Sequence, residues 1–215
     1  LIGGDGGMTA LSPSTAIDQY LYASVQEGPL VRVYINGANS TADLISPDEA
    51  GPGQFVTYFH LDPENPNILY YVSDDAIYRT TNAITATQTT GWEELTGVAQ
   101  TLTGDIFALA TTGGPYSTTN SYLFIGTANG KIYRIANPRD ALPSTIPTDI
   151  SPSTGMTGSS LVREIAVNPR NPNEVLAVVS NYGVASAFYT NNATTTTSPT
   201  WQLVEGNISL ASFRS

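Results

Sequence analysis

Acidic side chains are the residues of this sequence that could carry out hydrolysis. A glycoside hydrolase needs two carboxyl groups about 5–10 Å apart across a cleft. The candidates are Asp5, the neighbours Asp74 and Asp75, and Asp105. The Asp74–Asp75 pair falls in an expected tight turn, where acidic side chains usually hydrogen-bond the turn and face solvent. If a strand extended through the pair, the two side chains would point to opposite faces. We therefore assign no catalytic residue among them.

Three arginines recur at matching places in the chain, namely Arg32, Arg79 and Arg134. Three guanidinium groups that converged on one point could grip a carboxylate ligand through paired hydrogen bonds. Their regular spacing argues against such a site, because a site uses particular positions and not one position of every repeat. We interpret them as strand residues that pair with nearby carboxylates or cover tyrosine rings.

Metal and nucleophile chemistry is narrowly limited by composition. The chain has no cysteine and one histidine, His60, so thiolate metal sites and Cys–His nucleophiles are excluded. We interpret His60, between Phe59 and Leu61 in an apolar run, as a structural residue. Asp5 lies in a glycine-rich stretch that could bind calcium through loop carbonyls, but no calcium-loop spacing supports this. We expect no cofactor.

Aromatic residues offer a second kind of site, because sugars stack on aromatic rings. Most of the twelve tyrosines lie in expected strands and are predicted to pack between sheets. Tyr116 and Tyr182 lie in expected loops, and they are our candidates for ligand binding.

Charge and hydropathy exclude several partners. The net charge is −10 and there is a single lysine, so a nucleic acid partner is not expected. No apolar run reaches the 18 residues of a membrane span, so membrane insertion is not expected either. The absence of cysteine, the few charges and the many Thr, Ser, Asn, Gly and Pro residues favour an extracellular or cell-surface protein.

The elements that must position these residues are short strands. No segment has a helical period, and apolar runs of four to six residues are bounded by Gly, Pro, Asn and Asp. The densest runs recur about every 50 residues, a spacing typical of repeat architectures. These runs are Tyr20–Ala23, Ile68–Tyr71, Tyr122–Ile125 and Val175–Val178.

Each repeat supplies four expected strands, which predicts an all-β β-propeller made of four-stranded antiparallel blades. The expected first strands are Gly7–Leu11, Phe55–Leu61, Asp105–Ala110 and Leu161–Val167. The blades cover about 1–46, 55–96, 105–151 and 161–205, within one domain or fragment, 1–215, whose residues 206–215 would begin a further blade. Four blades suggest a partial arc of a larger propeller, and a small closed ring is the alternative.

Two stretches, Phe59–Trp92 and Ile165–Trp201, repeat one pattern: an Asn/Asp-Pro-x-Asn-Pro-Asn turn, a dense apolar run, a strand that ends in threonine, and a tryptophan. This pattern resembles the sortilin-like and bacterial neuraminidase repeat (Asp-box) propellers, which include the xyloglucanase type. The family's box is Ser-x-Asp-x-Gly-x-Thr-Trp. Here the matching residues have Asn in place of Asp and a later Trp, so we expect degenerate structural turns at Thr80, Asn82, Trp92 and at Thr190, Asn192, Trp201.

The resemblance implies a non-catalytic extracellular or cell-surface propeller that serves as a binding or scaffold module for glycan or protein. One alternative is part of a propeller-type glycoside hydrolase, xyloglucanase-like or sialidase-like, whose other blades lie outside this chain. Another is a structural segment of a larger surface assembly. Exposed blade edges could also associate with other blades, because unpaired strand edges are prone to pairing.

Overall fold

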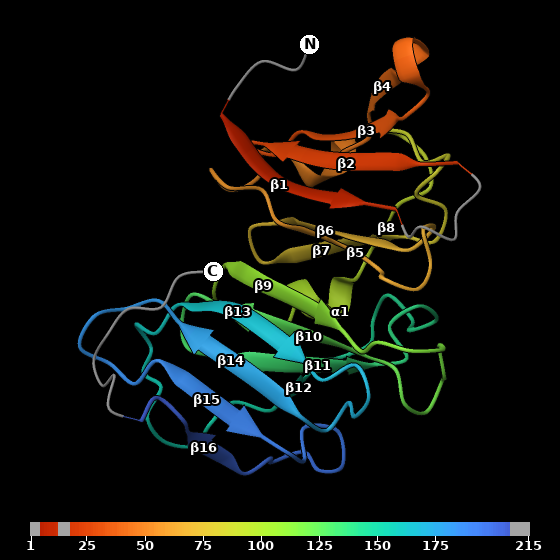
Figure 1. Cartoon of the computed structure of the whole chain (residues 1–215). Coiled ribbons are helices and arrows are strands. Elements are labelled where there is room, and N and C mark those ends of the chain that lie inside the picture. The colour runs from red at the N-terminus through yellow and green to blue at the C-terminus, as the bar shows by residue number, and fades with distance from the viewer. Residues whose placement is uncertain (1–4, 13–17, 207–215) are drawn as a thin grey trace. The chain divides into compact units, whose positions relative to one another are not determined.

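The computed structural model describes residues 5–12 and 18–206, and these residues form sixteen strands in four sheets (Figure 1). The first sheet holds β1 (Gly6–Leu11), β2 (Tyr20–Val25), β3 (Leu30–Tyr34) and β4 (Thr41–Leu44). The second holds β5 (Phe59–Leu61), β6 (Leu69–Ser73), β7 (Ala76–Thr80) and β8 (Glu93–Glu94). The third holds β9 (Ile106–Thr111), β10 (Tyr122–Thr127), β11 (Ile132–Ala136) and β12 (Thr148–Asp149). The fourth holds β13 (Val162–Val167), β14 (Val175–Val179), β15 (Ala187–Thr190) and β16 (Trp201–Leu203).

Every sheet is an antiparallel meander in which strands that follow one another in the chain pair side by side. The helices of the described chain are short: η1 (Gly37–Asn39), η2 (Asp48–Ala50) and α1 (Thr96–Ala99). The all-β class and the four four-stranded blades expected from the sequence are therefore confirmed. Among the described residues no helix is long and apolar enough to cross a membrane. The further blade expected from residue 206 falls on residues 207–215, which lie outside the described chain.

Continuous burial marks the second strand of the second blade, β6. All five residues of β6 are buried, as expected for a strand covered on both faces. The first strand of the second blade is shorter than predicted, because it begins at Phe59 and not at Phe55. The preceding segment is tied to the first blade instead: the Thr57 hydroxyl donates to the Val25 carbonyl at 2.9 Å and accepts the Gly28 N–H at 2.7 Å. These bonds tie Thr57 to the turn that joins β2 to β3 in the first blade.

The chain divides into two compact units, 1–99 and 100–215, and each contains two blades. In the first unit, Tyr22 and Leu30 of one blade pack against Phe59, Leu69 and Tyr71 of the next. In the second unit, the third and fourth blades pack in the same way. Its core includes Phe124, Ile132, Ile165, Val175 and Ala177.

The two repeated stretches noted in the sequence also fold alike. In the second blade the Asp62 carboxylate accepts the N–H groups of Glu64 and Asn65 at 2.9 and 3.1 Å. In the fourth blade Asn168 closes the matching turn by accepting the Arg170 N–H at 2.9 Å. Such side-chain bonds to the backbone stabilise turns that contain proline, since proline has no N–H of its own.

Candidate functional site

The acidic candidates are scattered over the two units. Asp5 precedes β1 and donates its backbone N–H to Gln26 Oε1 at 2.7 Å. Asp74 and Asp75 form the turn between β6 and β7, where Asp74 takes a left-handed backbone with φ of 51°. Asp105 is exposed just before β9. No described group of three or more His, Cys, Asp or Glu side chains could hold a metal ion.

The two loop tyrosines have contrasting surroundings. Tyr116 is half-buried, its hydroxyl donates to Asn137 Oδ1, and the Arg139 guanidinium lies over its ring at 4.2 Å. One face of that ring is therefore already covered. Tyr182 is 79% exposed. Neither tyrosine lines the groove described below.

Two of the three arginines, Arg32 and Arg134, bind the neighbouring blade. Arg32 on β3 donates to the backbone carbonyls of Ala83 and Ala86, both at 3.0 Å, and pairs with Asp43. Arg134 on β11 does the same in the second unit, where it donates to the carbonyls of Ala193 and Thr196. Arg79 pairs with Glu93 of its own blade. The guanidinium groups of Arg32 and Arg134 are therefore engaged in blade packing.

The residues at which we expected degenerate box turns lie in or beside the loops that receive those arginines. The Thr80 hydroxyl accepts the Asn82 N–H at 3.0 Å, and the Asn82 carbonyl accepts the N–H groups of Thr85 and Ala86. In the fourth blade, Asn192 Oδ1 accepts the Thr200 N–H at 3.0 Å. The Thr80 hydroxyl in the second blade and the Asn192 side chain in the fourth thus each bond to the backbone of this turn.

Both tryptophans tie their blade to the one before it. The indole N–H of Trp92 donates to the Ile45 carbonyl at 2.8 Å, at the end of the first blade's fourth strand. Trp201 donates to the Ile150 carbonyl at 2.7 Å, at the same place in the third blade. The polar ties of these two blade interfaces therefore include one from an arginine and one from a tryptophan in each.

His60 lies on β5, and burial lowers its pKa to about 4, against an opposing effect of Asp62. Its imidazole is therefore neutral at neutral pH, as expected for a structural histidine. The neighbouring side chains of β5, Phe59 and Leu61, are buried.

The second unit has a groove of about 800 Å³. It is lined by residues 129–131, Asp149, 151–154, 156–158 and 197–201. The lining is mainly hydroxyl, amide and backbone groups, with Trp201 as the aromatic member. Such a wall can offer both hydrogen bonds and ring contact to a polar ligand.

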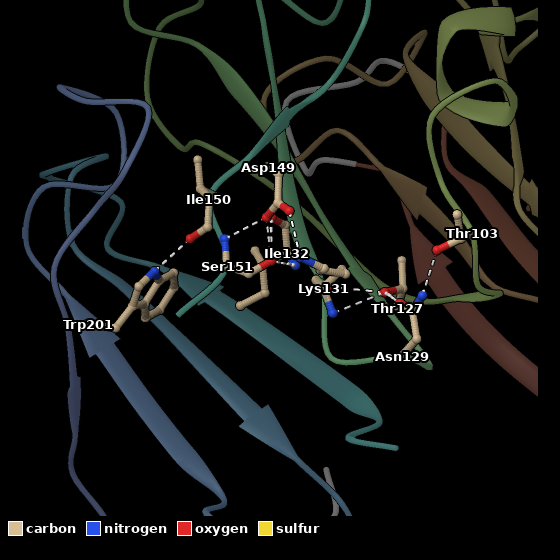
Figure 2. A network of polar contacts seen from close by, with 9 residues as sticks. All are labelled: Thr103, Thr127, Asn129, Lys131, Ile132, Asp149, Ile150, Ser151 and Trp201. Carbon is tan, nitrogen blue, oxygen red and sulfur yellow. Dashed lines mark hydrogen bonds and ion pairs between the residues drawn. The ribbon is translucent and has the colours of Figure 1, made fainter. Parts of the chain in front are cut away.

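A network of polar contacts fixes one wall of this groove (Figure 2). Asp149 lies at its centre, accepting from Lys131 Nζ at 2.8 Å and from the Ser151 hydroxyl at 2.5 Å. The Ser151 hydroxyl in turn accepts the Ile132 N–H at 2.9 Å. At the far end, Asn129 donates to the Thr103 hydroxyl at 2.8 Å. The network links these side chains to one another and to the backbone through hydrogen bonds.

The charges of this wall remain ionised over a wide pH range. Burial alone would raise the pKa of Asp149, but the hydrogen bonds from Lys131 and Ser151 outweigh it and hold the pKa below its usual value. The hydrogen bond to Asp149 raises the pKa of Lys131. An aspartate in this state is a good hydrogen-bond acceptor and a poor proton donor at neutral pH.

Sequence reasoning missed Lys131, Asp149 and Asn129 as site residues and assigned Trp201 a structural role only. The available signal was that Lys131 is the only lysine of the chain. A second signal was the Asn129-Gly130 turn that precedes Lys131, in which Gly130 has a φ of 74°. Neither signal shows that the loop of residues 151–158 lines the same groove as Asn129 and Lys131.

Comparisons with known proteins bear on the fold. No protein-family model matches the sequence, and a search of curated proteins gives no match. A GH74 enzyme of Niastella koreensis superposes with a TM-score of 0.60 at 17% identity, covering 96% of this chain and 30% of that protein. The GH74 xyloglucanase of Xanthomonas campestris superposes with a TM-score of 0.61 at 15% identity, covering 96% of this chain and 31% of that protein. PorZ is a surface component of the type-IX secretion system of Porphyromonas gingivalis. It superposes with a TM-score of 0.53 at 12% identity, covering 86% of this chain and 26% of that protein.

At these identities the likeness shows the fold alone. The chain is a β-propeller module of four blades, a partial propeller. It spans 30% and 31% of the length of the two GH74 proteins, so what those whole proteins do does not transfer to it directly.

Proposed function

We propose that this propeller module is a non-catalytic binding module at the cell surface, and that its ligand is a glycan held in the groove of the second unit. The observation that carries the proposal is the groove itself, about 800 Å³ with a mainly polar lining and one tryptophan. Sugars present many hydroxyl groups and flat apolar ring faces, so a wall of this composition complements them.

The fixed polar wall supports the same proposal. Lys131 and Asp149 can donate to and accept from neighbouring sugar hydroxyls, and Asn129 lies one turn away on the same side. Because these groups are already held by hydrogen bonds, a ligand would not have to order them on binding. This preorganisation favours recognition of a neutral polar ligand.

The alternative is that the chain is part of a glycoside hydrolase, which would need two carboxyl groups across the cleft. Among the described residues that line the groove, Asp149 is the only carboxylate, and its pKa is lowered by its hydrogen bonds although burial opposes this. A general acid needs a raised pKa at neutral pH. The groove therefore supports binding better than hydrolysis.

A glycan array followed by calorimetry, together with a reducing-sugar assay on the same glycans, tests the proposal. Xyloglucan oligosaccharides are included because one structural neighbour is a xyloglucanase. We expect binding without release of reducing ends. Ser153→Trp should fill the groove and abolish binding, whereas Ser159→Trp, exposed in the same loop but not part of the lining, should bind as wild type.

Two results would overturn the proposal: no binding to any glycan, or equal binding by the Ser153→Trp and wild-type proteins. Release of reducing ends would support the hydrolase alternative instead.

A further inference from the structure

The groove lies at a junction between two blades, and the first unit contains the same kind of junction. The loop that follows β12 and the loop that follows β4 both begin with Ile-Ser-Pro, at residues 150–152 and 45–47. Ile150 donates its N–H to the Ile132 carbonyl at 2.9 Å, and Ile45 donates its N–H to the Leu30 carbonyl at 2.8 Å. The two junctions can therefore be compared residue by residue.

The charged wall of the groove has no counterpart in the first junction. The strand pairing places Lys131 at the position of Pro29, and Asp149 at the position of Leu44. Lys131 Nζ donates to the Asp149 carboxylate at 2.8 Å, whereas proline and leucine side chains carry no polar atom. This ion pair is therefore a feature of the second junction and not of the repeat.

The first junction is instead bridged by two hydrogen bonds. Asp48 donates its backbone N–H to the Gln88 carbonyl at 2.9 Å, and Gln88 Nε2 donates to Asp48 Oδ1 at 2.8 Å. We call these two bonds the Asp48–Gln88 bridge. It joins the loop that follows β4 to the loop between β7 and β8. A ligand could lie between these loops only by breaking the bridge.

The matching residues of the second junction are Ser153 and Thr197. Ser153 follows the shared Ile-Ser-Pro segment directly, as Asp48 does. The second pair is matched by a turn in which a threonine hydroxyl accepts the N–H two residues further on: Thr87 and Thr89 in the first unit, Thr196 and Ser198 in the second. Gln88 and Thr197 are the central residues of these two turns.

No bridge forms at the second junction. Ser153 and Thr197 are exposed, and both line the groove. The structure describes the whole of both loops, and no hydrogen bond joins residues 151–158 to residues 197–200. The second junction is thus open at the place where the first is bridged.

We propose that Ser153 and Thr197 are specificity-determining residues of the groove: their short side chains leave open a junction that aspartate and glutamine would bridge. The inference rests on the proposed glycan-binding function, and it explains why the second unit and not the first would hold the glycan. It also gives the glycan a position, between residues 151–158 and 197–200 and beside the Lys131–Asp149 pair.

Transplanting the bridge into the groove tests this proposal. The double variant Ser153→Asp, Thr197→Gln should bind the array glycan that the wild type binds most tightly at least about tenfold more weakly, because that glycan would have to break the new hydrogen bonds. Each single variant should lose less affinity than the double variant, since the bridge needs both side chains. Calorimetry measures the three affinities, and circular dichroism checks that each variant is folded.

A readout without glycan separates this inference from the proposed function. Trp201 lines the groove, so a bridge across the groove should reduce the quenching of its fluorescence by acrylamide. Trp92, the other tryptophan of the chain, is untouched by both substitutions and contributes the same signal in every protein compared. The double variant should therefore be quenched less than the wild type and less than either single variant.

The matched control is the double variant Asp48→Ser, Gln88→Thr, which removes the bridge of the first unit and leaves the groove intact. It should bind the glycan as the wild type does, and a loss of binding would place the glycan in the first unit and overturn the inference. A Ser153→Asp, Thr197→Gln protein with wild-type affinity or wild-type quenching would also overturn it, although the proposed function would stand. A wild type that binds no glycan would overturn both.

Discussion

Trp201 donates its indole N–H to the backbone carbonyl of Ile150 at 2.7 Å. This bond links the start of the outer strand of the fourth blade to the end of the outer strand of the third blade. The bond recurs in the other unit between Trp92 and Ile45 at 2.8 Å. Trp201 also lines the groove, so one residue both fixes the blade interface and forms part of the candidate ligand wall.

Trp201→Phe should destabilise the fold by about 1–3 kcal/mol, because the Ile150 carbonyl loses its indole donor while phenylalanine keeps most of the apolar contact. The free energy of unfolding, measured by urea titration, checks this value. Tyr182→Phe should leave the free energy of unfolding unchanged, because Tyr182 is 79% exposed. A Trp201→Phe protein as stable as wild type would show that the bond contributes nothing.

Arg134→Gln should destabilise the fold by about 2–3 kcal/mol, because the loop carbonyls of Ala193 and Thr196 lose a charged donor. Arg134→Lys should recover little of this loss, since an ammonium group does not reproduce the planar guanidinium fork. Arg170→Gln removes an exposed arginine from the same unit and serves as the control for net charge. Equal losses for Arg134→Gln and Arg170→Gln would contradict a packing role for Arg134.

Gly126→Ala should destabilise the fold by about 1–3 kcal/mol through overpacking. A Cβ atom at this position of β10 would stand 2.5 Å from Val162 Cγ1 of the fourth blade and 3.1 Å from Ala108 Cβ. Gly158→Ala is the matched control, because a Cβ there would meet nothing within 4 Å. The thermal midpoints of the two variants give the comparison, and similar midpoints would mean that the blades separate easily at Gly126.

The Lys131–Asp149 pair predicts a broad pH plateau. Asp149 has a lowered pKa, so its contribution to stability is present above the ordinary Asp value of about 4 and is lost as pH falls through the lowered one. Lys131 has a raised pKa, so its contribution is present below about 10.4 and is lost as pH rises through the raised one.

The stability difference between wild type and Asp149→Asn should therefore be constant from about pH 5 to about pH 9. It should be less than about 1 kcal/mol, because both side chains of the pair are partly exposed. Unfolding titrations at several pH values measure this difference. A change centred near neutral pH would mean that Asp149 titrates there, and would favour an acid–base role for it.

The sequence alone determined the repeat, the all-β class and most strand positions. Short apolar runs such as Ile68–Val72, bounded by turns of proline and asparagine, can bury themselves only as strands between two neighbouring sheets. The dense run Val175–Val178 lies within the observed strand β14, which spans Val175–Val179. Phe55 was misplaced because its apolar neighbours look like a strand, whereas a Thr57 hydroxyl bonded to the first blade decides the path of the chain.

Only the tertiary structure decided which residues form the groove. Lys131 and Asp149 lie far apart in the sequence and become neighbours through the pairing of β11 with β12, and Trp201 reaches them from another blade. The tertiary structure also gave Arg32 and Arg134 their partners, which are backbone carbonyls of the next blade. Backbone carbonyls occur at every residue, so no pattern of side chains in the sequence can mark the ones that an arginine will bind.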